Sequence, residues 1–361
     1  MSANFAFTPS AQPMAEEARA AALLNPGFGK IFTDHMLVMN YSAEEGWDKG
    51  EIRARAPFQV QPGSAVLHYA QEIFEGMKAY RLPDGGLSLF RPEANARRFA
   101  QSAERMAMPV LPEQTFIDAV RAFVKAEQAW TPTPDIGSLY LRPFMFADEA
   151  FLGVRPAGRY SFVVIGCPAG GYFKAGADTV TIWVSETFSR AGVGGTGAAK
   201  CGGNYAASLV AQAEGMRHGC DQVMFLDAAE RSWIEELGGM NVFFVFADGS
   251  LLTPPLEGTI LPGVTRDSLI RLARDAGLRV REEKYAISQC IADAKSGALR
   301  EAFACGTAAV VAPIARIRGK AFDVQVADGR PGEVTTRLRA ALSDIQFGRT
   351  ADPYGWVRRV V

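Results

Sequence analysis

Short apolar runs separated by turn residues fill the chain from Ile31 to Ala79, and a pattern typical of a helix follows them. Residues 93–106 carry alanine and arginine at helical spacing, which predicts a helix. Residues 138–146 and 160–165 are apolar and rich in aromatic and branched side chains, and they predict neighbouring strands of one sheet. Strands and helices alternate from there, so the pattern indicates an α/β protein.

A break rich in proline and glycine, at Cys167-Pro-Ala-Gly-Gly-Tyr-Phe173, predicts the end of that sheet. Beyond it, strands are predicted over 179–184, 223–226 and 242–246. Helices are predicted over 205–218 and 265–276, the second ending at Gly277. The length of 361 residues fits two domains. We therefore expect domains over 1–167 and 179–361, a linker over 168–178 and an N-terminal arm over 1–24.

Composition limits the kinds of partner. With 48% hydrophobic residues and a net charge of −1, the chain has a large core but no basic surface for nucleic acid or for an anionic membrane. No apolar stretch approaches the ~20 residues that cross a bilayer, and the first 24 residues resemble neither a secretory signal nor a transit peptide. We expect a cytoplasmic protein whose partners are small molecules.

Cysteine and histidine usage argues against metal and disulfide chemistry. The five cysteines form an odd set without a CxxC pair, which fits a reducing compartment and neither a disulfide framework nor a structural zinc site. The three histidines lie at no metal-ligand spacing. Neither a metal site nor catalysis by histidine is expected.

Lys200 lies in a stretch of small residues, Gly192-Val-Gly-Gly-Thr-Gly-Ala-Ala-Lys200-Cys-Gly-Gly-Asn-Tyr205, and Glu236 follows later in the chain. A lysine amine is a nucleophile toward carbonyl carbons, and a carboxylate is the partner that a pyridine nitrogen needs when the ring accepts electrons. The pair suggests pyridoxal phosphate. A solvated surface lysine is the plain alternative, and these residues alone do not decide between them. A nucleotide-binding phosphate loop is excluded, because Ala199 and Cys201 stand where it needs glycine and a hydroxyl residue.

Two further segments could hold a phosphate. Leu261-Pro-Gly-Val-Thr265 turns directly into the predicted helix and presents main-chain amides, and Cys305-Gly-Thr307-Ala-Ala309 offers a hydroxyl beside consecutive amides. Arg98, on the helix over 93–106, could add a bidentate guanidinium. Each feature by itself is better explained by an ordinary capped helix, a turn or a solvated arginine.

Together these residues resemble the branched-chain amino acid aminotransferases, a class IV pyridoxal-phosphate family, and the resemblance runs from about Gly27 to the C-terminus. It implies a fold-type IV enzyme with a smaller N-terminal α/β domain, a larger C-terminal domain and the cofactor at their interface, assembled as a homodimer. The matching motifs are Phe32-Thr-Asp-His-Met, Leu67-His-Tyr, Phe74-Glu-Gly-Met-Lys-Ala, Leu89-Phe-Arg-Pro with Arg98, Leu139-Tyr-Leu-Arg-Pro, Lys200-Cys-Gly-Gly-Asn-Tyr, Glu236 to Asn241, and Leu261-Pro-Gly-Val.

The resemblance also implies roles for single residues. Lys200 would form the Schiff base, Tyr205 would bind the ring hydroxyl of the cofactor, and Glu236 would bind the pyridine nitrogen. Arg142 would bind the second carboxylate of glutamate. The phosphate would be bound by Arg98, Val264, Thr265 and Thr307. The α-carboxylate would be bound by the amides of Ala308 and Ala309. The substrate side chain would be bound by Phe74, Tyr140 and Tyr172, together with Tyr69 of the partner subunit.

Two positions depart from the pattern of the family. Gly239 stands where many relatives have a threonine whose hydroxyl reaches the substrate carboxylate, so that contact is missing or comes from elsewhere. Ala309 and Ala312 stand where some animal members carry a redox-active CxxC pair, so thiol regulation of that kind is not expected.

The activity that the resemblance implies is reversible ping-pong transfer of an amino group between L-leucine, L-isoleucine or L-valine and 2-oxoglutarate. Three alternatives remain open. Another enzyme of the same fold, a D-amino-acid aminotransferase or an aminodeoxychorismate lyase, would share the lysine and the glutamate. A non-catalytic pyridoxal-phosphate carrier would bind the cofactor but not react with amino acids, and a purely structural protein would bind no cofactor.

Overall fold

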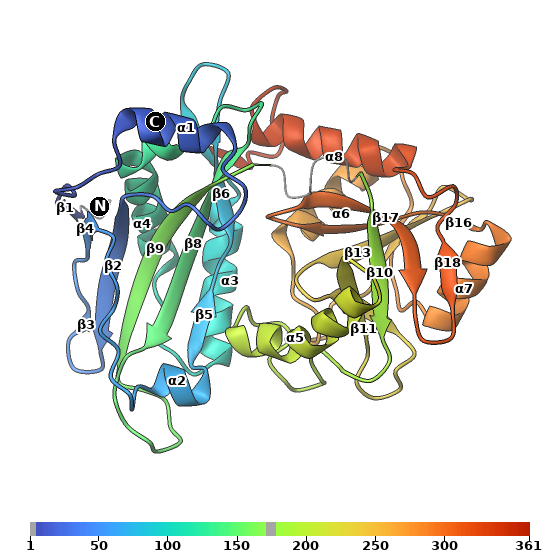
Figure 1. Ribbon diagram of the computed structural model, residues 1–361, viewed down its shortest axis with the longest axis horizontal. Coiled ribbons are helices and arrows are strands. Elements are labelled where there is room, and N and C mark those ends of the chain that lie inside the picture. Colours follow the sequence, from blue (N-terminus) through green and yellow to red (C-terminus); the bar gives the residue numbers. More distant parts are fainter. Residues whose placement is uncertain (1–4, 171–177) are drawn as a thin grey trace. The chain divides into compact units, whose positions relative to one another are not determined.

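The computed structural model describes residues 5–170 and 178–361, which fold as two compact units, each built around its own sheet (Figure 1). Unit 1 comprises Met1–Tyr172, Ala199–Gly202 and Asp344–Val361, and unit 2 comprises Phe173–Ala198 and Gly203–Ser343. The prediction of an α/β protein with two domains of mixed helix and strand is confirmed for the described residues.

The sheet of unit 1 has ten strands among the described residues, in the order β1-β4-β2-β9-β8-β6-β7-β19, with β3 paired to β2 and β5 paired to β8. Its two longest strands, β8 and β9, pair antiparallel from Ser138 opposite Ala169 to Ala147 opposite Tyr160, as the apolar runs predict. The strands are β1 (Ala6–Phe7), β2 (His35–Ser42), β3 (Gly46–Trp47), β4 (Glu51–Ala54), β5 (Glu72–Phe74), β6 (Met77–Arg81), β7 (Leu87–Phe90), β8 (Ser138–Ala147), β9 (Arg159–Ala169) and β19 (Val357–Arg359).

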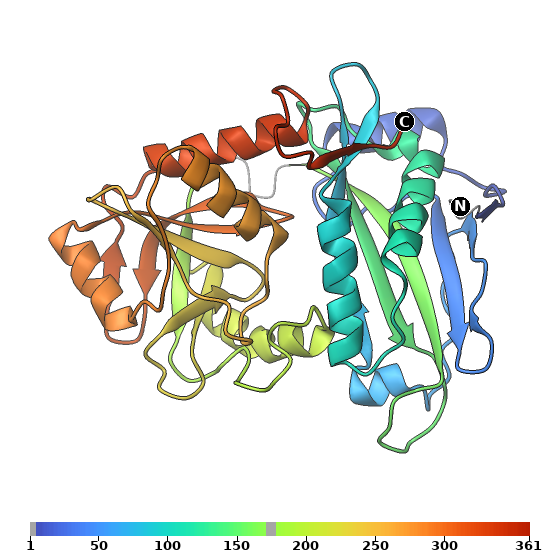
Figure 2. The ribbon, with the colours of Figure 1, turned by 180° about the vertical axis from the view of Figure 1, so that it is seen from behind.

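Two helices cover one face of this sheet (Figure 2). The rings of Phe99 and Phe116, one from each helix, lie 5.1 Å apart, and both lie within 6 Å of the ring of Phe162 on β9. All three are buried, and each burial contributes roughly 1.5–3 kcal/mol. The helices of unit 1 are α1 (Glu16–Leu24), α2 (Ala65–Tyr69), the covering pair α3 (Pro92–Arg105) and α4 (Glu113–Ala126), and the 3₁₀ turn η1 (Gln128–Trp130).

The last strand before the predicted break ends within the segment 167–173, but two of its residues lie beyond Cys167. Strand β9 continues to Ala169, with Pro168 opposite Leu139 on β8. An antiparallel ladder alternates hydrogen-bonded and non-hydrogen-bonded pairs, so a proline fits at a position that needs no N–H donor. Most of the predicted linker, together with Tyr172, lies outside the described residues.

The sheet of unit 2 is mixed, in the order β12-β11-β10-β17-β16-β13-β14-β15, with β18 paired to β17. Helix α5 packs through Ala211 against Trp183, Val223 and Phe225 of β10 and β11. The predicted strands and helices of this half are present. The elements are β10 (Val180–Ser185), α5 (Gly202–Arg217), β11 (Gln222–Leu226), β12 (Ile234–Leu237), β13 (Asn241–Phe246), β14 (Leu251–Thr253), α6 (Val264–Asp275), β15 (Val280–Glu282), α7 (Ile287–Ser296), β16 (Leu299–Gly306), β17 (Val310–Arg318), β18 (Asp323–Gln325) and α8 (Glu333–Gln346).

Two segments from the second half of the chain belong to unit 1. They are Ala199–Gly202 and Asp344–Val361. The C-terminal strand β19 pairs antiparallel with β7, with Val357 opposite Phe90, and the ring of Trp356 lies 5.6 Å from that of Phe90. Pairing between segments so far apart in sequence leaves no local pattern that could predict it.

None of the helices in the described part of the chain is long and apolar enough to cross a bilayer.

Lys78 on β6 provides a test of stability. It is buried, and burial lowers the pKa of its amine to about 8. Replacing it with methionine removes a group whose pKa is lower in the folded chain than in the unfolded one, so we expect the stability difference between Lys78→Met and the wild type to depend on pH. Between about pH 8 and pH 10.5 the unfolded wild-type chain binds more protons than the folded one, so wild-type stability rises with pH relative to the variant. Urea unfolding of both proteins across this range checks the sign of this change, and a difference in stability that stays constant with pH would contradict the argument.

Candidate functional site

Lys200 is fixed in unit 1 by its own backbone. Its amide donates to the hydroxyl of Ser102 on α3 at 3.0 Å, and its carbonyl accepts from the amide of Phe74 on β5 at 3.0 Å. The next turn is held by a bond from the amide of Gly202 to the carboxylate of Glu72. Ala199 and Cys201 are buried in the core of unit 1. A small residue on either side of the lysine lets the segment enter this core and leaves the amine at its edge.

The amine of Lys200 and the guanidinium of Arg142 both lie over the ring of Phe74. The Nζ of Lys200 is 4.9 Å from the ring centre of Phe74, and the guanidinium of Arg142 is 4.7 Å from the same ring. Arg142 also donates to the hydroxyl of Tyr140 at 3.1 Å. A Cβ on Gly76 would come within 2.3 Å of that hydroxyl, so the chain needs glycine there. The structure thus brings together four of the residues that the sequence singled out.

Arg98 is buried on α3 and forms a two-pronged ion pair with Glu75. Its Nε and Nη2 donate to the two carboxylate oxygens at 2.7 and 2.8 Å, and Asn95 donates to Glu75 as well. Burial alone would raise the pKa of Glu75, but the charges of Arg98 and Lys200 and the hydrogen bonds outweigh it and lower that pKa. Glu75 therefore orients the guanidinium of Arg98.

Tyr69 contacts the loop that follows β8 in unit 1. Its hydroxyl donates to the carbonyl of Leu152, and its ring lies 6.5 Å from that of Phe151. The interactions described for Tyr69 in its own chain are therefore with the loop after β8.

In unit 2, Glu236 on β12 is held by donors from three other segments. Arg190 donates to its Oε1 at 2.8 Å, the amide of Leu261 donates to the same oxygen at 2.8 Å, and Asn241 donates to Oε2 at 3.3 Å. Glu236 and Arg190 are both almost fully buried. An opposite charge and hydrogen bonds to the charged form favour a carboxylate over a carboxylic acid.

The helix α6 starts beside this carboxylate. Asn241 also donates to the carbonyl of Leu261 at 3.0 Å, and a Cβ on Gly263 would come within 2.0 Å of the Asn241 oxygen. Gly263 is the residue before the helix and makes no side-chain cap, and the buried Thr265 lies in the first turn. The main-chain amides and partial positive charge at such a helix start suit a phosphate.

The predicted segment at Thr307 is a turn between β16 and β17. Residues 307–309 form the turn, and Gly306 pairs with Val310. Val310 has a φ of 61°, in the left-handed region that β-branched residues strongly disfavour. Backbone strain of this kind concentrates at ligand-binding turns, which supports a functional role for the segment.

Tyr205 lies on the first turns of α5, and Gly239 lies beside it. A Cβ built on Gly239 would meet the Tyr205 ring at 3.6 Å, an ordinary contact. A Cβ therefore fits at Gly239 without a clash, so the departure from the family at this position is not forced by a contact at Cβ.

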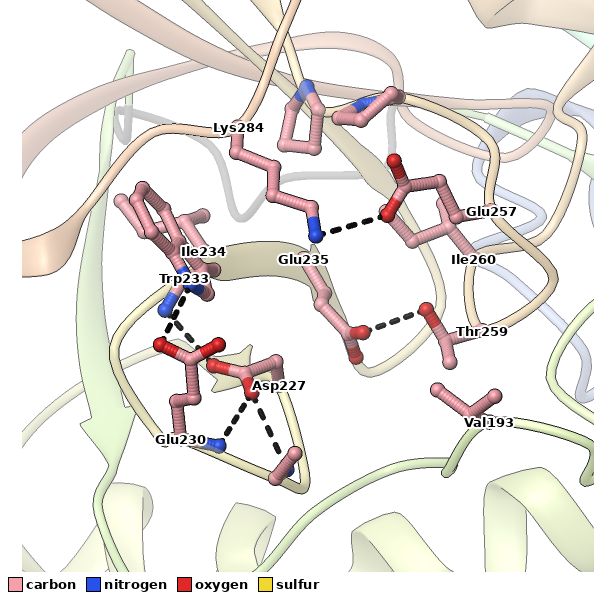
Figure 3. Close-up of a pocket in the computed structure, with 13 residues that line it drawn as sticks. Val193, Asp227, Glu230, Trp233, Ile234, Glu235, Glu257, Thr259, Ile260 and Lys284 are labelled. Atoms are coloured by element: carbon pink, nitrogen blue, oxygen red, sulfur yellow. Dashed lines mark hydrogen bonds and ion pairs between the residues drawn. The ribbon is translucent and has the colours of Figure 1, made fainter.

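Glu235, the residue before Glu236, faces a separate pocket (Figure 3). Its carboxylate accepts from the hydroxyl of Thr259, and across the pocket Lys284 pairs with Glu257 at 3.1 Å. Burial raises the pKa of Glu235, opposed by the bond from Thr259. Because successive residues of a strand point to opposite faces, the side chains of Glu235 and Glu236 lie in different surroundings.

Sequence reasoning missed three residues that the structure places around the predicted ones, namely Glu75, Arg190 and Asn241. Glu75 and Asn241 stand inside quoted motifs, so the motifs signalled their presence but not their partners. Arg190 precedes the glycine-rich stretch and carries no local signal. No group of three or more potential metal ligands occurs among the described residues.

Comparisons with known proteins identify the family of this chain. Residues 72–317 match the family described as class IV amino-transferases. A probable branched-chain-amino-acid aminotransferase of Streptomyces coelicolor is 53% identical over 350 residues, which cover 97% of this chain and 96% of the relative.

Two solved structures are similar as well. The Escherichia coli branched-chain amino acid aminotransferase has a TM-score of 0.76 and 31% identity, covering 91% of this chain and 99% of that one. The branched-chain amino acid aminotransferase of Thermobaculum terrenum, in its PLP-bound holo-form, has a TM-score of 0.73 and 25% identity, covering 91% and 98%. The chain therefore belongs to the class IV aminotransferases and, within them, to the branched-chain-amino-acid aminotransferase family.

Proposed function

We propose that this chain transfers amino groups between L-leucine, L-isoleucine or L-valine and 2-oxoglutarate in a ping-pong cycle that depends on pyridoxal phosphate. The observation that carries the proposal is the placement of Lys200. Its backbone is fixed on both sides, and its amine lies beside an apolar aromatic cluster that also contains a guanidinium. A covalent catalytic amine, an apolar side-chain site and a partner for a second carboxylate are the three things that these two substrates require.

The residues present fit the cofactor. The carboxylate of Glu236 is surrounded by a cation and hydrogen-bond donors, which suits a partner for a protonated pyridine nitrogen. Tyr205 would hold the ring hydroxyl. The phosphate would be bound by Arg98, by the helix start at Val264 and Thr265, and by Thr307. When bound, the cofactor supplies a carbonyl carbon for the amino group and an electron-accepting ring.

Side chains of this protein would transfer the proton and bind the substrate. Lys200 would hold the cofactor at rest, and its released Nζ would carry the proton from Cα of the amino acid to the cofactor carbon that receives the amino group, and in the reverse direction in the other half of the cycle. Phe74 and Tyr140, with Tyr172 and Tyr69 of the partner subunit, would bind the branched side chain, at about 0.8 kcal/mol per buried methylene. The amides of Ala308 and Ala309 would bind the α-carboxylate.

The proposed assembly is a homodimer, which the role of Tyr69 requires, and the proposed location is the cytoplasm, which the five buried free cysteines fit. Mixing a Tyr69→Ala, Lys200-containing chain with a Lys200→Ala chain tests the assembly. Mixed dimers would contain one site with both an intact lysine and an intact partner tyrosine, so activity would exceed that of either variant alone.

Arg142 provides a test of the substrate assignment. A lost charge-assisted hydrogen bond costs about 1.5–3 kcal/mol, so we expect Arg142→Ala to raise KM for 2-oxoglutarate by about 10–100-fold. KM for leucine, which has no second carboxylate, is expected to rise less than about 3-fold. Steady-state kinetics with each substrate varied separately measure both. Arg159→Ala, an exposed arginine on β9, is the matched control. Equal effects on the two substrates would refute the assignment.

The experiment that tests the function itself is the visible spectrum of the purified protein before and after L-leucine, without any oxo acid. We expect the band of the lysine-bound cofactor to give way to that of its amine form, and 2-oxoglutarate to restore it. An unchanged yellow spectrum would favour a D-specific enzyme, a lyase or a carrier. A preparation that stays colourless after added pyridoxal phosphate would remove the cofactor from the argument.

A further inference from the structure

Arg190 and Glu236 form an ion pair inside unit 2. The guanidinium Nη1 lies 2.8 Å from the carboxylate Oε1, and the side chains are only 2% and 3% exposed. Burying two charges is costly unless they pair well and their remaining hydrogen-bonding groups are satisfied. One member of this buried pair, Glu236, is the proposed partner of the pyridine nitrogen. The pair therefore calls for an explanation beyond stability.

Arg190 also joins two backbone segments that border Glu236. Its Nη1 donates to the carbonyl of Thr259 at 3.1 Å and is 3.3 Å from the carbonyl of Gly197. These two segments touch, because a Cβ on Gly197 would come within 2.3 Å of the Thr259 oxygen. One guanidinium thus links the glycine-rich stretch, the segment leading to α6 and the carboxylate on β12.

We propose that Arg190 is a positioning residue for Glu236, keeping its carboxylate ionised and fixed so that it can accept a hydrogen bond from a protonated pyridine nitrogen. The inference rests on the function proposed above, and it adds a residue that the sequence did not single out. The amide of Leu261 and the side chain of Asn241 complete the orientation, but both are neutral, so among these three donors Arg190 alone carries a compensating charge.

Other titratable groups lie near this carboxylate. Cys305 on β16 is buried, and its pKa is raised mainly by burial, with Glu236 adding to the rise and Arg266 opposing it. The thiol is therefore neutral at physiological pH. Glu235 lies next to Glu236 in sequence but bonds to Thr259, with Asp227, Arg190 and Lys284 acting on its charge. The ionisation of Glu236 should accordingly respond to Arg190 more than to any of these groups.

The direct test uses the protein without cofactor, so that it can fail or succeed independently of the catalytic proposal. Glutamate side chains labelled with ¹³C at the carboxyl carbon are followed by NMR across pH, and the signal missing from Glu236→Gln identifies Glu236. We expect Arg190→Met to move its titration upward by more than about one pH unit, the size of effect that a lost neighbouring charge produces. Arg190→Lys, which keeps the charge, is expected to move it less.

The second measurement uses the loaded enzyme and separates positioning from simple structural support. In the pH profile of kcat, the acid limb should shift to higher pH in Arg190→Met and return toward the wild-type position in Arg190→Lys. A purely structural role would lower the temperature midpoint of unfolding without moving that limb. Unchanged titration of Glu236 in both variants would overturn the inference. If Arg190→Met does not fold, Arg190→Gln takes its place, because glutamine also removes the charge but keeps hydrogen-bond donors, and a Glu236 titration in Arg190→Gln that matches the wild type would overturn the inference equally.

Discussion

Lys200→Ala is expected to abolish amino transfer and the absorption of covalently held cofactor together. A positioned general base contributes about 10²–10⁴-fold in rate, and the loss of the covalent nucleophile adds to it, so turnover should fall by about 10⁴-fold or more. Alanine fits the surroundings, since Ala199 and Cys201 on either side are small and buried. The fold should therefore persist while the chemistry is lost.

The measurement is a comparison of turnover, visible spectrum and thermal midpoint for the variant and the wild type. Lys125→Ala, an exposed lysine on α4, is the matched control and should leave all three unchanged. Since the backbone of residue 200 makes the bonds to Ser102 and Phe74, those bonds survive the substitution. A variant that is still yellow and active would refute the assignment of Lys200.

Glu236→Gln is expected to lower kcat by on the order of 10²–10³-fold, the size of effect seen when one preorganised electrostatic group is removed. Cofactor affinity should change much less, because Lys200 and the phosphate-binding residues remain. Glutamine keeps a hydrogen-bonding oxygen but no negative charge, so it favours an unprotonated pyridine nitrogen and weakens the ring as an electron acceptor.

Glu235→Gln is the matched control for this second prediction. It makes the same chemical change one residue earlier on β12, where the carboxylate bonds to Thr259 in the separate pocket (Figure 3). Its kcat should stay near the wild-type value. Turnover, dialysis-based cofactor affinity and urea unfolding distinguish catalysis from stability, because the glutamine variant also leaves Arg190 without its anionic partner. Wild-type kinetics in Glu236→Gln would contradict the role.

Much of the fold could be read from local patterns. The apolar runs at β8 and β9, the helix α3 and the strand and helix order of unit 2 follow from side-chain periodicity, which is a property of neighbouring residues. Strand β9 extends through Pro168 because an antiparallel ladder can accept a proline at a position that needs no N–H donor. The pairing of the C-terminal strand β19 with β7 has no local pattern, because it depends on residues far away in sequence.

The candidate site divides in the same way. By itself the sequence determined which residues can carry the chemistry, since a lysine among small residues, a later carboxylate and the ordered motifs are readable in one dimension. Only the tertiary structure decided their partners: Glu75 beside Arg98, Arg142 over Phe74, and Arg190 on Glu236. The chemical identity of a residue is a property of that residue alone, whereas charge pairing and burial arise only when distant segments meet. Charge pairing and burial set the ionisation and orientation of each group.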